Sequence, residues 1–240
     1  MNTVAQNFIK WYQESYWTAT GEVFDIGIAT REAIIRLENG VKPVLAGGFE
    51  ASSNGNGSLM RILPLLTYIN DIPVSERFQT IKQVSSITHG HIRSVISCFY
   101  YLEFARQIVN GKDKFEIYSA LQTEVTDFLI SISVNPAEIK FFDRLLKQDI
   151  SIFKEDEISS SGYVLHTLEA SIWCLLTTDN YQEAVLKAVN LGEDTDTTGA
   201  VTGGLAALLY GYESIPQQWI SKLAKQSEIF DLADRMYNKL

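Results

Sequence analysis

The strongest constraint on the fold of this chain is a helical spacing of apolar residues that returns along nearly its whole length. In residues 115–132, apolar side chains recur every three or four positions with polar residues between them, a period that forms one apolar stripe along a helix. No two alternating segments are joined by Asn-Gly or Asp-Gly, the usual sign of a β-hairpin. The sequence therefore predicts an all-α protein, folded as a single multi-helix domain over residues 1–240.

The predicted helices are separated by a few stretches without helical period. One helix is predicted from Asn135 to Lys147, because an N-cap residue is followed by Pro136 and, three residues after the cap, by Glu138. The longest stretch without helical period covers residues 40–57, and a second polar stretch covers 155–162. Long loops in compact domains tend to carry function, so both are candidate rims of a site. The other helices are predicted over residues 3–14, 29–39, 58–69, 75–87, 91–110, 115–132, 163–177, 181–190, 197–210 and 217–239.

Size and charge narrow the possible functions. A chain of 240 residues that is 46% hydrophobic can bury a real core. Its net charge of -9 argues against sequence-independent nucleic-acid binding, which needs a basic surface, but leaves room for a small anionic ligand. The apolar stretch 198–212 is too short, and too rich in Thr and Gly, to span a bilayer. We therefore expect neither a nucleic-acid nor a membrane partner.

The cysteines and the N-terminal residues indicate the compartment. Cys98 and Cys174 lie in apolar stretches and are expected to be small core residues in a reducing environment. The first residues have neither a basic region nor a continuous apolar run, so they do not read as a signal peptide. A cytoplasmic protein is expected.

A cluster of oxygen donors stands just before a predicted helix of very small residues. Residues 192–204 read Gly-Glu-Asp-Thr-Asp-Thr-Thr-Gly-Ala-Val-Thr-Gly-Gly, which brings Asp194, Asp196 and Thr197 close together. Two carboxylates so close repel each other, and a cation would balance them; hard oxygen donors favour Mg²⁺, Mn²⁺ or Ca²⁺ over zinc or copper. The other interpretation is a helix cap with an acidic first turn. The local sequence leaves both open.

A glycine-rich segment feeds a second predicted helix. Residues 54–58 read Asn-Gly-Asn-Gly-Ser and lead directly into Leu59, where unpaired N–H groups would suit an anion such as phosphate. An ordinary connection that binds nothing is the alternative. Arg61 is expected either to add a charge-assisted hydrogen bond to the anion or to pair with a carboxylate.

Two other places hold titratable side chains at helix junctions. His89 and His91 flank Gly90, and because only one further histidine and no nearby cysteine exist, a zinc site is disfavoured. One imidazole is expected to cap a helix and the other to face a ligand. Asp25 lies between apolar neighbours, which predicts either a partly buried acid or the cap of the helix that begins near Ala29.

Taken in order, five segments resemble the ADP-ribosylglycohydrolase family, which also includes the J1 crystallins. They are residues 21–27 (GEVFDIG), 55–61 (GNGSLMR), 88–91 (THGH), 162–170 (GYVLHTLEA) and 192–197 (GEDTDT). The ordered set is far more specific than any one segment. The resemblance implies an all-α domain with a pair of Mg²⁺ or Mn²⁺ ions in a cleft. It also implies hydrolysis of the glycosidic bond that joins ADP-ribose to a protein side chain or a related acceptor.

The resemblance also implies roles for individual residues. Asp194, Asp196 and Thr197 are expected to bind the metal ions, and Asp25 and Asp196 to take part in catalysis. The ions would orient the ribose and activate a water, while a carboxylate moves the proton. The expected substrate-binding residues are Asn54, Gly55, Asn56, Gly57, Ser58, His89, Gly162 and Tyr163.

Two departures from the family pattern affect the expected metal site. Glu193 stands where the family usually has glycine. In the family, a segment with a Thr-Asp-Asp or Ser-Asp-Asp metal motif precedes the point where this chain begins, and no Asp-Asp pair occurs in this sequence. Half of the ligand set is therefore expected to be missing, so that one weakly held ion is predicted, together with an apolar face left uncovered.

Three functions stay open on the sequence. The first is a metal-dependent ADP-ribosylglycohydrolase, impaired by its shortened N-terminal part, that acts on an ADP-ribosylated protein or an ADP-ribose-containing small molecule. The second is a protein that binds ADP-ribose or a nucleotide without turnover. The third is a structural protein like the crystallins. Neither the acceptor nor the oligomeric state can be read from the sequence.

Overall fold

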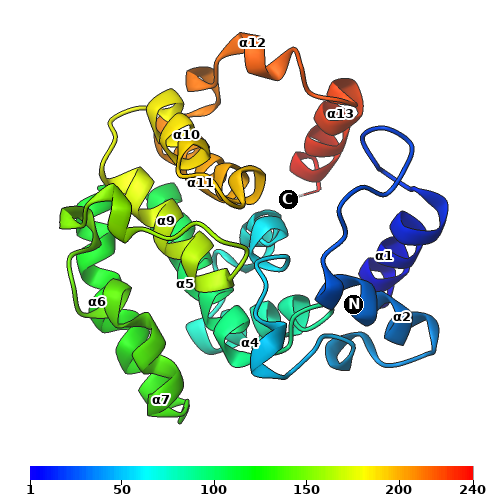
Figure 1. Cartoon of the computed structure of the whole chain (residues 1–240), viewed down its shortest axis with the longest axis horizontal. Coiled ribbons are helices and arrows are strands. Elements are labelled where there is room, and N and C mark those ends of the chain that lie inside the picture. Colours follow the sequence, from blue (N-terminus) through cyan, green and yellow to red (C-terminus); the bar gives the residue numbers. More distant parts are fainter. Residues whose placement is uncertain (240) are drawn as a thin grey trace.

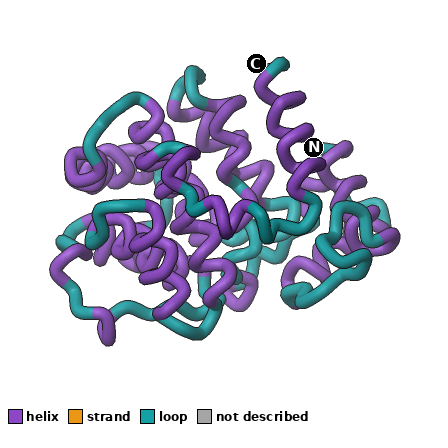
Figure 2. Tube along the Cα trace, turned by 90° about the horizontal axis from the view of Figure 1, so that it is seen from above, coloured by secondary structure: helices purple, strands orange, loops and turns teal. Residues whose placement is uncertain are grey.

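The fold consists of helices joined by loops and short turns (Figures 1 and 2). The computed structural model describes residues 1–239, and within that range the only β-type pairings are two isolated bridges. The all-α prediction is confirmed. The α-helices are α1 (Asn2–Glu14), α2 (Ile28–Glu38), α3 (Leu66–Ile69), α4 (Val74–Ser85), α5 (Ile92–Val109), α6 (Lys114–Ser131), α7 (Pro136–Ile139), α8 (Asp143–Leu146), α9 (Val164–Leu176), α10 (Tyr181–Asn190), α11 (Thr195–Tyr210), α12 (Gln217–Ile220) and α13 (Gln226–Tyr237).

Helices α5 and α9 form the centre of the core because nearly every face of each is apolar. In α9 every residue except His166 is buried, and α5 buries large rings such as Tyr100 and Phe104. A helix that is apolar all round must be covered on all sides, and α6, α10 and α11 pack around this pair (Figure 1). Both predicted core cysteines, Cys98 and Cys174, are buried and free.

Helix α11 approaches its neighbours closely because it carries glycines at the contacts. A Cβ added at Gly199 would lie 3.1 Å from Val189, and one at Gly204 would lie 2.7 Å from Leu63 and from the Tyr101 hydroxyl. The Tyr101 hydroxyl also donates a hydrogen bond of 2.9 Å to a backbone carbonyl of α11. The run of small residues after the acidic cluster is thus used for packing between helices.

Three predicted helices are broken in the structure. Residues 58–69 form two 3₁₀ turns and then α3, because Pro64 lacks an N–H donor and its ring prevents a continuous α-helix. Residues 135–147 form α7, a 3₁₀ turn and α8, although the Asn135 side chain caps α7 as predicted, accepting from Ala137 N at 2.9 Å. Residues 217–239 form α12 and α13, interrupted where Lys225 adopts a left-handed φ of 56°.

Apolar side chains stay exposed near both ends of the chain. No residue of α13 is buried, and its Phe230 and Leu232 are 37% and 46% exposed. Phe24 and Ile28, before and at the start of α2, are 84% and 77% exposed.

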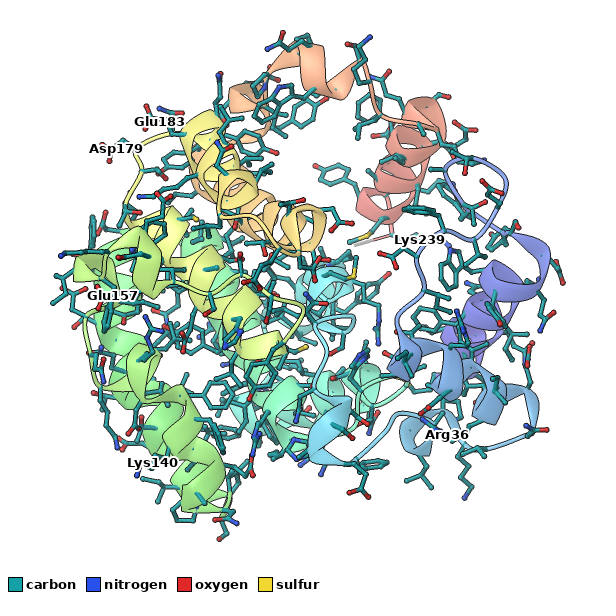
Figure 3. All side chains as sticks on the ribbon, in the orientation of Figure 1. Arg36, Lys140, Glu157, Asp179, Glu183 and Lys239 are labelled. Carbon is teal, nitrogen blue, oxygen red and sulfur yellow. The ribbon has the colours of Figure 1, made fainter. Side chains whose placement is uncertain are left out.

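Charged side chains line the outside of the helices. Lys140, Asp179 and Glu183 lie at the periphery in Figure 3, and all three are exposed. No helix within residues 1–239 has both the length and the apolar content that crossing a membrane requires.

Candidate functional site

The loop of residues 54–58 buries its polar side chains and leaves its glycines partly exposed. Asn54, Asn56 and Ser58 are 3%, 8% and 0% exposed, while Gly55 and Gly57 alternate with them at the surface. The loop leads into a three-residue 3₁₀ turn, so the predicted α-helix at Leu59 is wrong. A ligand on this loop would therefore meet glycines and backbone rather than the asparagine and serine side chains.

A second candidate segment is hydrogen-bonded to this loop. The Asn56 backbone N–H donates to the Gly162 carbonyl at 3.0 Å, and the Val164 N–H donates to the Asn54 carbonyl at 2.9 Å. Gly55 and Tyr163 form an isolated antiparallel β-bridge between the two segments. Two segments about a hundred residues apart in the sequence, both predicted to bind substrate, therefore lie side by side.

The side chain of Asn56 connects these segments to the acidic cluster. Its Nδ2 donates to Asp194 Oδ2 at 2.7 Å and to Thr167 Oγ1 at 2.8 Å. The backbone N–H of Asp194 donates to the Ser160 carbonyl at 3.1 Å. Three of the predicted site segments thus share one hydrogen-bonded network, with a buried asparagine at its centre.

The helix-cap interpretation of the acidic cluster is confirmed for the acidic first turn, where Asp196 lies, and only in part for Asp194. This residue occupies the N-cap position of α11, but its side chain makes no capping hydrogen bond and is turned toward Asn56 instead. Asp196, in the first turn and exposed, accepts from Thr197 N at 2.9 Å through Oδ1. Asp194 Oδ1 and Asp196 Oδ2 have no donor within the described residues, so each carboxylate keeps one oxygen for another partner.

The oxygen donors near the start of α11 are of the kind that a hard cation binds, but they are fewer than a complete set of ligands. Asp194, Asp196 and Thr197 offer carboxylate and hydroxyl oxygens, which Mg²⁺ and Mn²⁺ accept. Within residues 1–239, however, no group of three or more His, Cys, Asp or Glu side chains is placed to hold a metal ion. The set fits a Mg²⁺ that keeps several waters and substrate oxygens, as this ion usually does.

Asp25 lies apart from this network. It is exposed, with a left-handed φ of 46°, and the N-cap of α2 is Gly27. The predictions of a partly buried acid and of a helix cap are therefore both wrong. Within residues 1–239 no hydrogen bond or ion pair joins Asp25 to the other candidate residues.

The two neighbouring histidines have different positions. His91 caps α5, its Nδ1 accepting from Arg93 N at 3.2 Å, so the predicted capping imidazole is confirmed. His89 is 2% exposed and lies beneath the glycine loop, with its Nε2 3.4 Å from where a Cβ on Gly55 or Gly57 would be. Burial, and after it the nearby positive charge of Arg61, lowers the pKa of His89 to about 3.

Arg61 pairs with no carboxylate. Its Nη2 donates to Thr88 Oγ1 at 2.7 Å and to the Val84 carbonyl at 3.2 Å, and its guanidinium lies 4.9 Å from the centre of the Phe8 ring. No acidic side chain within residues 1–239 comes within ion-pair distance of it. Burial lowers the pKa of Arg61 to about 10, so the group stays a cation near neutral pH.

Sequence reasoning missed three residues that hold the site together. Thr167 accepts from Asn56, and Ser160 Oγ donates to the Gly192 carbonyl at 2.9 Å, which ties the 155–162 loop to the start of α11. Ser161 Oγ is 2.7 Å from Nδ1 of His166. The signal for Ser160 and Ser161 is the run of serines in a loop already expected to form a rim, and Thr167 lies within the family segment 162–170.

Fold and contacts together define the class: a helical protein whose site is assembled from distant loops around one buried asparagine. A sequence model of the ADP-ribosylglycohydrolase family matches residues 1–240. The chain belongs to the ADP-ribosylglycohydrolase family.

Two relatives carry the same name. The chain is 31% identical to ADP-ribosylarginine hydrolase Tri1 of Serratia proteamaculans, over 97% of this chain and 59% of that protein. It is 30% identical to ADP-ribosylarginine hydrolase Tri1 of Pseudomonas putida, over 99% of this chain and 60% of that protein. The chain thus spans about three fifths of the length of these relatives.

A further relative and a solved structure extend the comparison. The ADP-ribosyl-[dinitrogen reductase] glycohydrolase of Rhodospirillum rubrum is 26% identical, over 85% of this chain and 62% of that protein. A chain of a solved structure described as an ADP-ribosylglycohydrolase-related protein complex aligns with a TM-score of 0.77 and 26% identity, over 99% of this chain and 73% of that chain. The fold observed here is therefore the fold of the family.

Proposed function

We propose that this chain carries an ADP-ribosyl hydrolase site that releases ADP-ribose from a modified arginine side chain of a protein. Membership of the family and the two relatives named as ADP-ribosylarginine hydrolases support this choice of substrate. The observation that carries the proposal is the double hydrogen bond of Asn56 Nδ2, which couples the glycine loop to Asp194. These hydrogen bonds support the proposal that the ligand loop and the metal ligand act as one unit.

The proposed roles follow from which groups of each segment are exposed and which are buried. The backbone and glycines of residues 54–58 would hold the diphosphate, while His89, Gly162 and Tyr163 would line the nucleotide and ribose pocket. Because the polar side chains of the loop are buried, its contribution is shape and backbone N–H groups. The proposed substrate is an ADP-ribosylated protein or an ADP-ribose-containing small molecule. The protein would act in the cytoplasm, and no nucleic acid would take part.

Asp194, Asp196 and Thr197 are the proposed ligands of Mg²⁺ or Mn²⁺. A bound ion would supply charge stabilisation and an activated water. Asn56 holds the Asp194 carboxylate in one orientation before any ligand arrives, which is the usual task of a residue behind a metal ligand. Asp196 and Asp25 are the proposed carboxylates for proton transfer, and both are exposed enough to reach a substrate.

Release of ADP-ribose from an ADP-ribosylated arginine peptide, with and without Mn²⁺, tests the proposal. We expect hydrolysis that needs Mn²⁺ and falls by roughly 100-fold or more in Asp196→Ala, since a ligand and a proton carrier are lost together. Asp127→Asn, an exposed change on α6, is the matched control and should keep full activity. Activity that survives both a chelator and Asp196→Ala would contradict the proposed site.

Binding of ADP-ribose without turnover is the second candidate function. One observation favours it: within residues 1–239 no three His, Cys, Asp or Glu side chains are grouped so that they could hold a metal ion. Activation of water depends on complete ligand geometry, whereas a glycine loop can bind a phosphate without it. Calorimetry with ADP-ribose, run beside the hydrolysis assay at saturating Mn²⁺, separates the two: saturable heat with no product supports the binding protein.

A further inference from the structure

We infer that Arg144, which lies outside the candidate site, is a positioning residue for Asp194 and acts on it through Ser160. Arg144 anchors the loop of residues 153–160, Ser160 at the end of this loop holds the turn before α11, and that turn presents Asp194. That Asp194 binds a metal ion rests on the proposed function. The anchoring does not, because it consists of contacts within the protein.

The turn before α11 needs support from outside. Gly192 and Glu193 have φ angles of 83° and 53°, both in the left-handed region. Glycine adopts this conformation freely, whereas a residue with a Cβ, such as Glu193, does so at a cost and keeps it only where surrounding contacts hold it. Asp194 follows directly, so the direction of its carboxylate depends on whether this turn is held.

Ser160 supplies the contacts that hold the turn. Its Oγ donates to the Gly192 carbonyl at 2.9 Å, and its carbonyl accepts from the Asp194 N–H at 3.1 Å. These two hydrogen bonds lie on either side of Glu193, and Ser160 itself is 2% exposed. One buried residue thus clamps both ends of the left-handed turn, and the position of Ser160 sets where Asp194 lies.

Arg144, on α8, anchors the loop that carries Ser160. Its Nη2 donates to the Glu157 carbonyl at 2.9 Å, and its guanidinium lies 4.5 Å from the centre of the Phe153 ring. Glu157 stands only three residues before Ser160 in the chain. Trp173 also holds the loop, since its Nε1 donates to the Phe153 carbonyl at 3.0 Å. Loss of Arg144 should therefore loosen this loop without unfolding the protein.

Glu169 holds the other side of Arg144. Arg144 Nη1 lies 3.3 Å from Glu169 Oε2, and Glu169 belongs to the buried helix α9. Within residues 1–239 no other cation comes within ion-pair distance of this carboxylate. A guanidinium carries its donors in a planar fork and can hold a carboxylate and a carbonyl at once, which the single ammonium of lysine does less well. Arg144 thus ties the loop to the core of the protein.

Hydrogen exchange of backbone amides, measured by NMR in the metal-free protein, tests the anchoring. In Arg144→Met the Asp194 amide should exchange roughly 10-fold faster, while the amides of the buried helix α5 keep their rates. Arg144→Lys, a milder change, should show the same local effect at a smaller size. Lys147→Met is the matched control, because it removes an exposed cation of the same helix that pairs with Asp143 and should change neither rate.

Two results of the exchange experiment would overturn the inference. One is an Asp194 amide that exchanges at the wild-type rate in both Arg144 variants. The other is an equal acceleration of Asp194 and α5 amides, since this would show a general loss of stability rather than an effect on the turn.

Calorimetry with Mn²⁺ alone tests the consequence for the proposed metal site. Arg144→Met and Ser160→Ala should each weaken Mn²⁺ binding by roughly 3- to 10-fold, and the double variant should lose no more than the larger single loss, because both act along one path. Additive losses, or an unchanged affinity in Arg144→Met, would refute the inference and leave the proposed function standing. If the wild-type protein binds no Mn²⁺, the proposed metal site fails, while the exchange experiment still decides whether Arg144 anchors Asp194.

Discussion

Replacing Glu169 by glutamine should make the stability of the protein less sensitive to pH. Glu169 lies in α9, 6% exposed, with Arg144 Nη1 3.3 Å from its carboxylate. Burial raises its pKa from 4.5 to about 7, and the partly exposed Arg144 lowers it only in part. Such a rise corresponds to about 3 kcal/mol of unfolding free energy.

The sign of the effect follows from which state binds the proton. Between pH 4.5 and about 7 the folded protein keeps Glu169 protonated while the unfolded chain has released that proton. Stability contributed by the neutral carboxyl is therefore present below this window and is lost as the pH rises through it. Glutamine has the same shape and no charge, so it avoids this loss.

Urea unfolding of both proteins at about pH 5 and about pH 8 measures the effect. The free energy of unfolding of Glu169→Gln relative to wild type should increase by about 3 kcal/mol between the two conditions. Glu76→Gln, an exposed change on α4, should show a difference that varies by less than about 0.5 kcal/mol. In Arg144→Met the free energy of unfolding should fall more between pH 5 and pH 8 than it does in the wild-type protein, because the cation that stabilises the Glu169 carboxylate is removed. A difference between Glu169→Gln and wild type that is the same at both pH values would refute the reasoning.

Three more outcomes are expected. Asn56→Ala should weaken Mn²⁺ binding by roughly 10- to 100-fold, because Asp194 loses its orienting donor, and calorimetry with Mn²⁺ alone would show it; an unchanged affinity would count against the coupling. Gly204→Val should lower the free energy of unfolding, measured with urea, by about 1–3 kcal/mol or more, because a Cβ at this position already overlaps the side chains of Leu63 and Tyr101. Lys114→Met should lower the free energy of unfolding by about 1.5–3 kcal/mol in the same measurement, because it removes the buried amine that donates hydrogen bonds to two carbonyls at the end of α9. A loss below about 0.5 kcal/mol would mean that water satisfies these carbonyls in place of the amine.

The helices were predictable because each follows from a local pattern. The apolar stripe of α6 and the cap at Asn135 are both readable within a few residues of sequence, and both exist in the structure. The breaks were less predictable, because the 3₁₀ turns around Pro64 depend on how the chain packs as well as on the proline. The left-handed residue Lys225 carries no compositional sign at all, since glycine is the usual residue there.

The site was predictable as a set of segments and not as a set of contacts. Family resemblance identified the segments that contain Asn56, Gly162 and Asp194, and the structure brings them together. That Asn56 faces inward to bind Asp194 could not be read, because a hydrogen bond across 138 residues leaves no trace in local spacing. Asp25 failed for the opposite reason: its apolar neighbours suggested burial, yet Phe24 beside it is itself exposed.

The contact between His89 and the glycines limits how this protein can be altered. Because a Cβ on Gly57 would meet the ring at 2.8 Å, a larger residue at this position would have to displace the ring. Residues 155–157, Ser159 and Glu193 are exposed and lie next to Ser160 and Asp194 in the chain, so side chains at these positions have room to vary, whereas Ile158 belongs to the core. A randomised library of this protein should therefore vary the exposed positions and keep Gly57 unchanged.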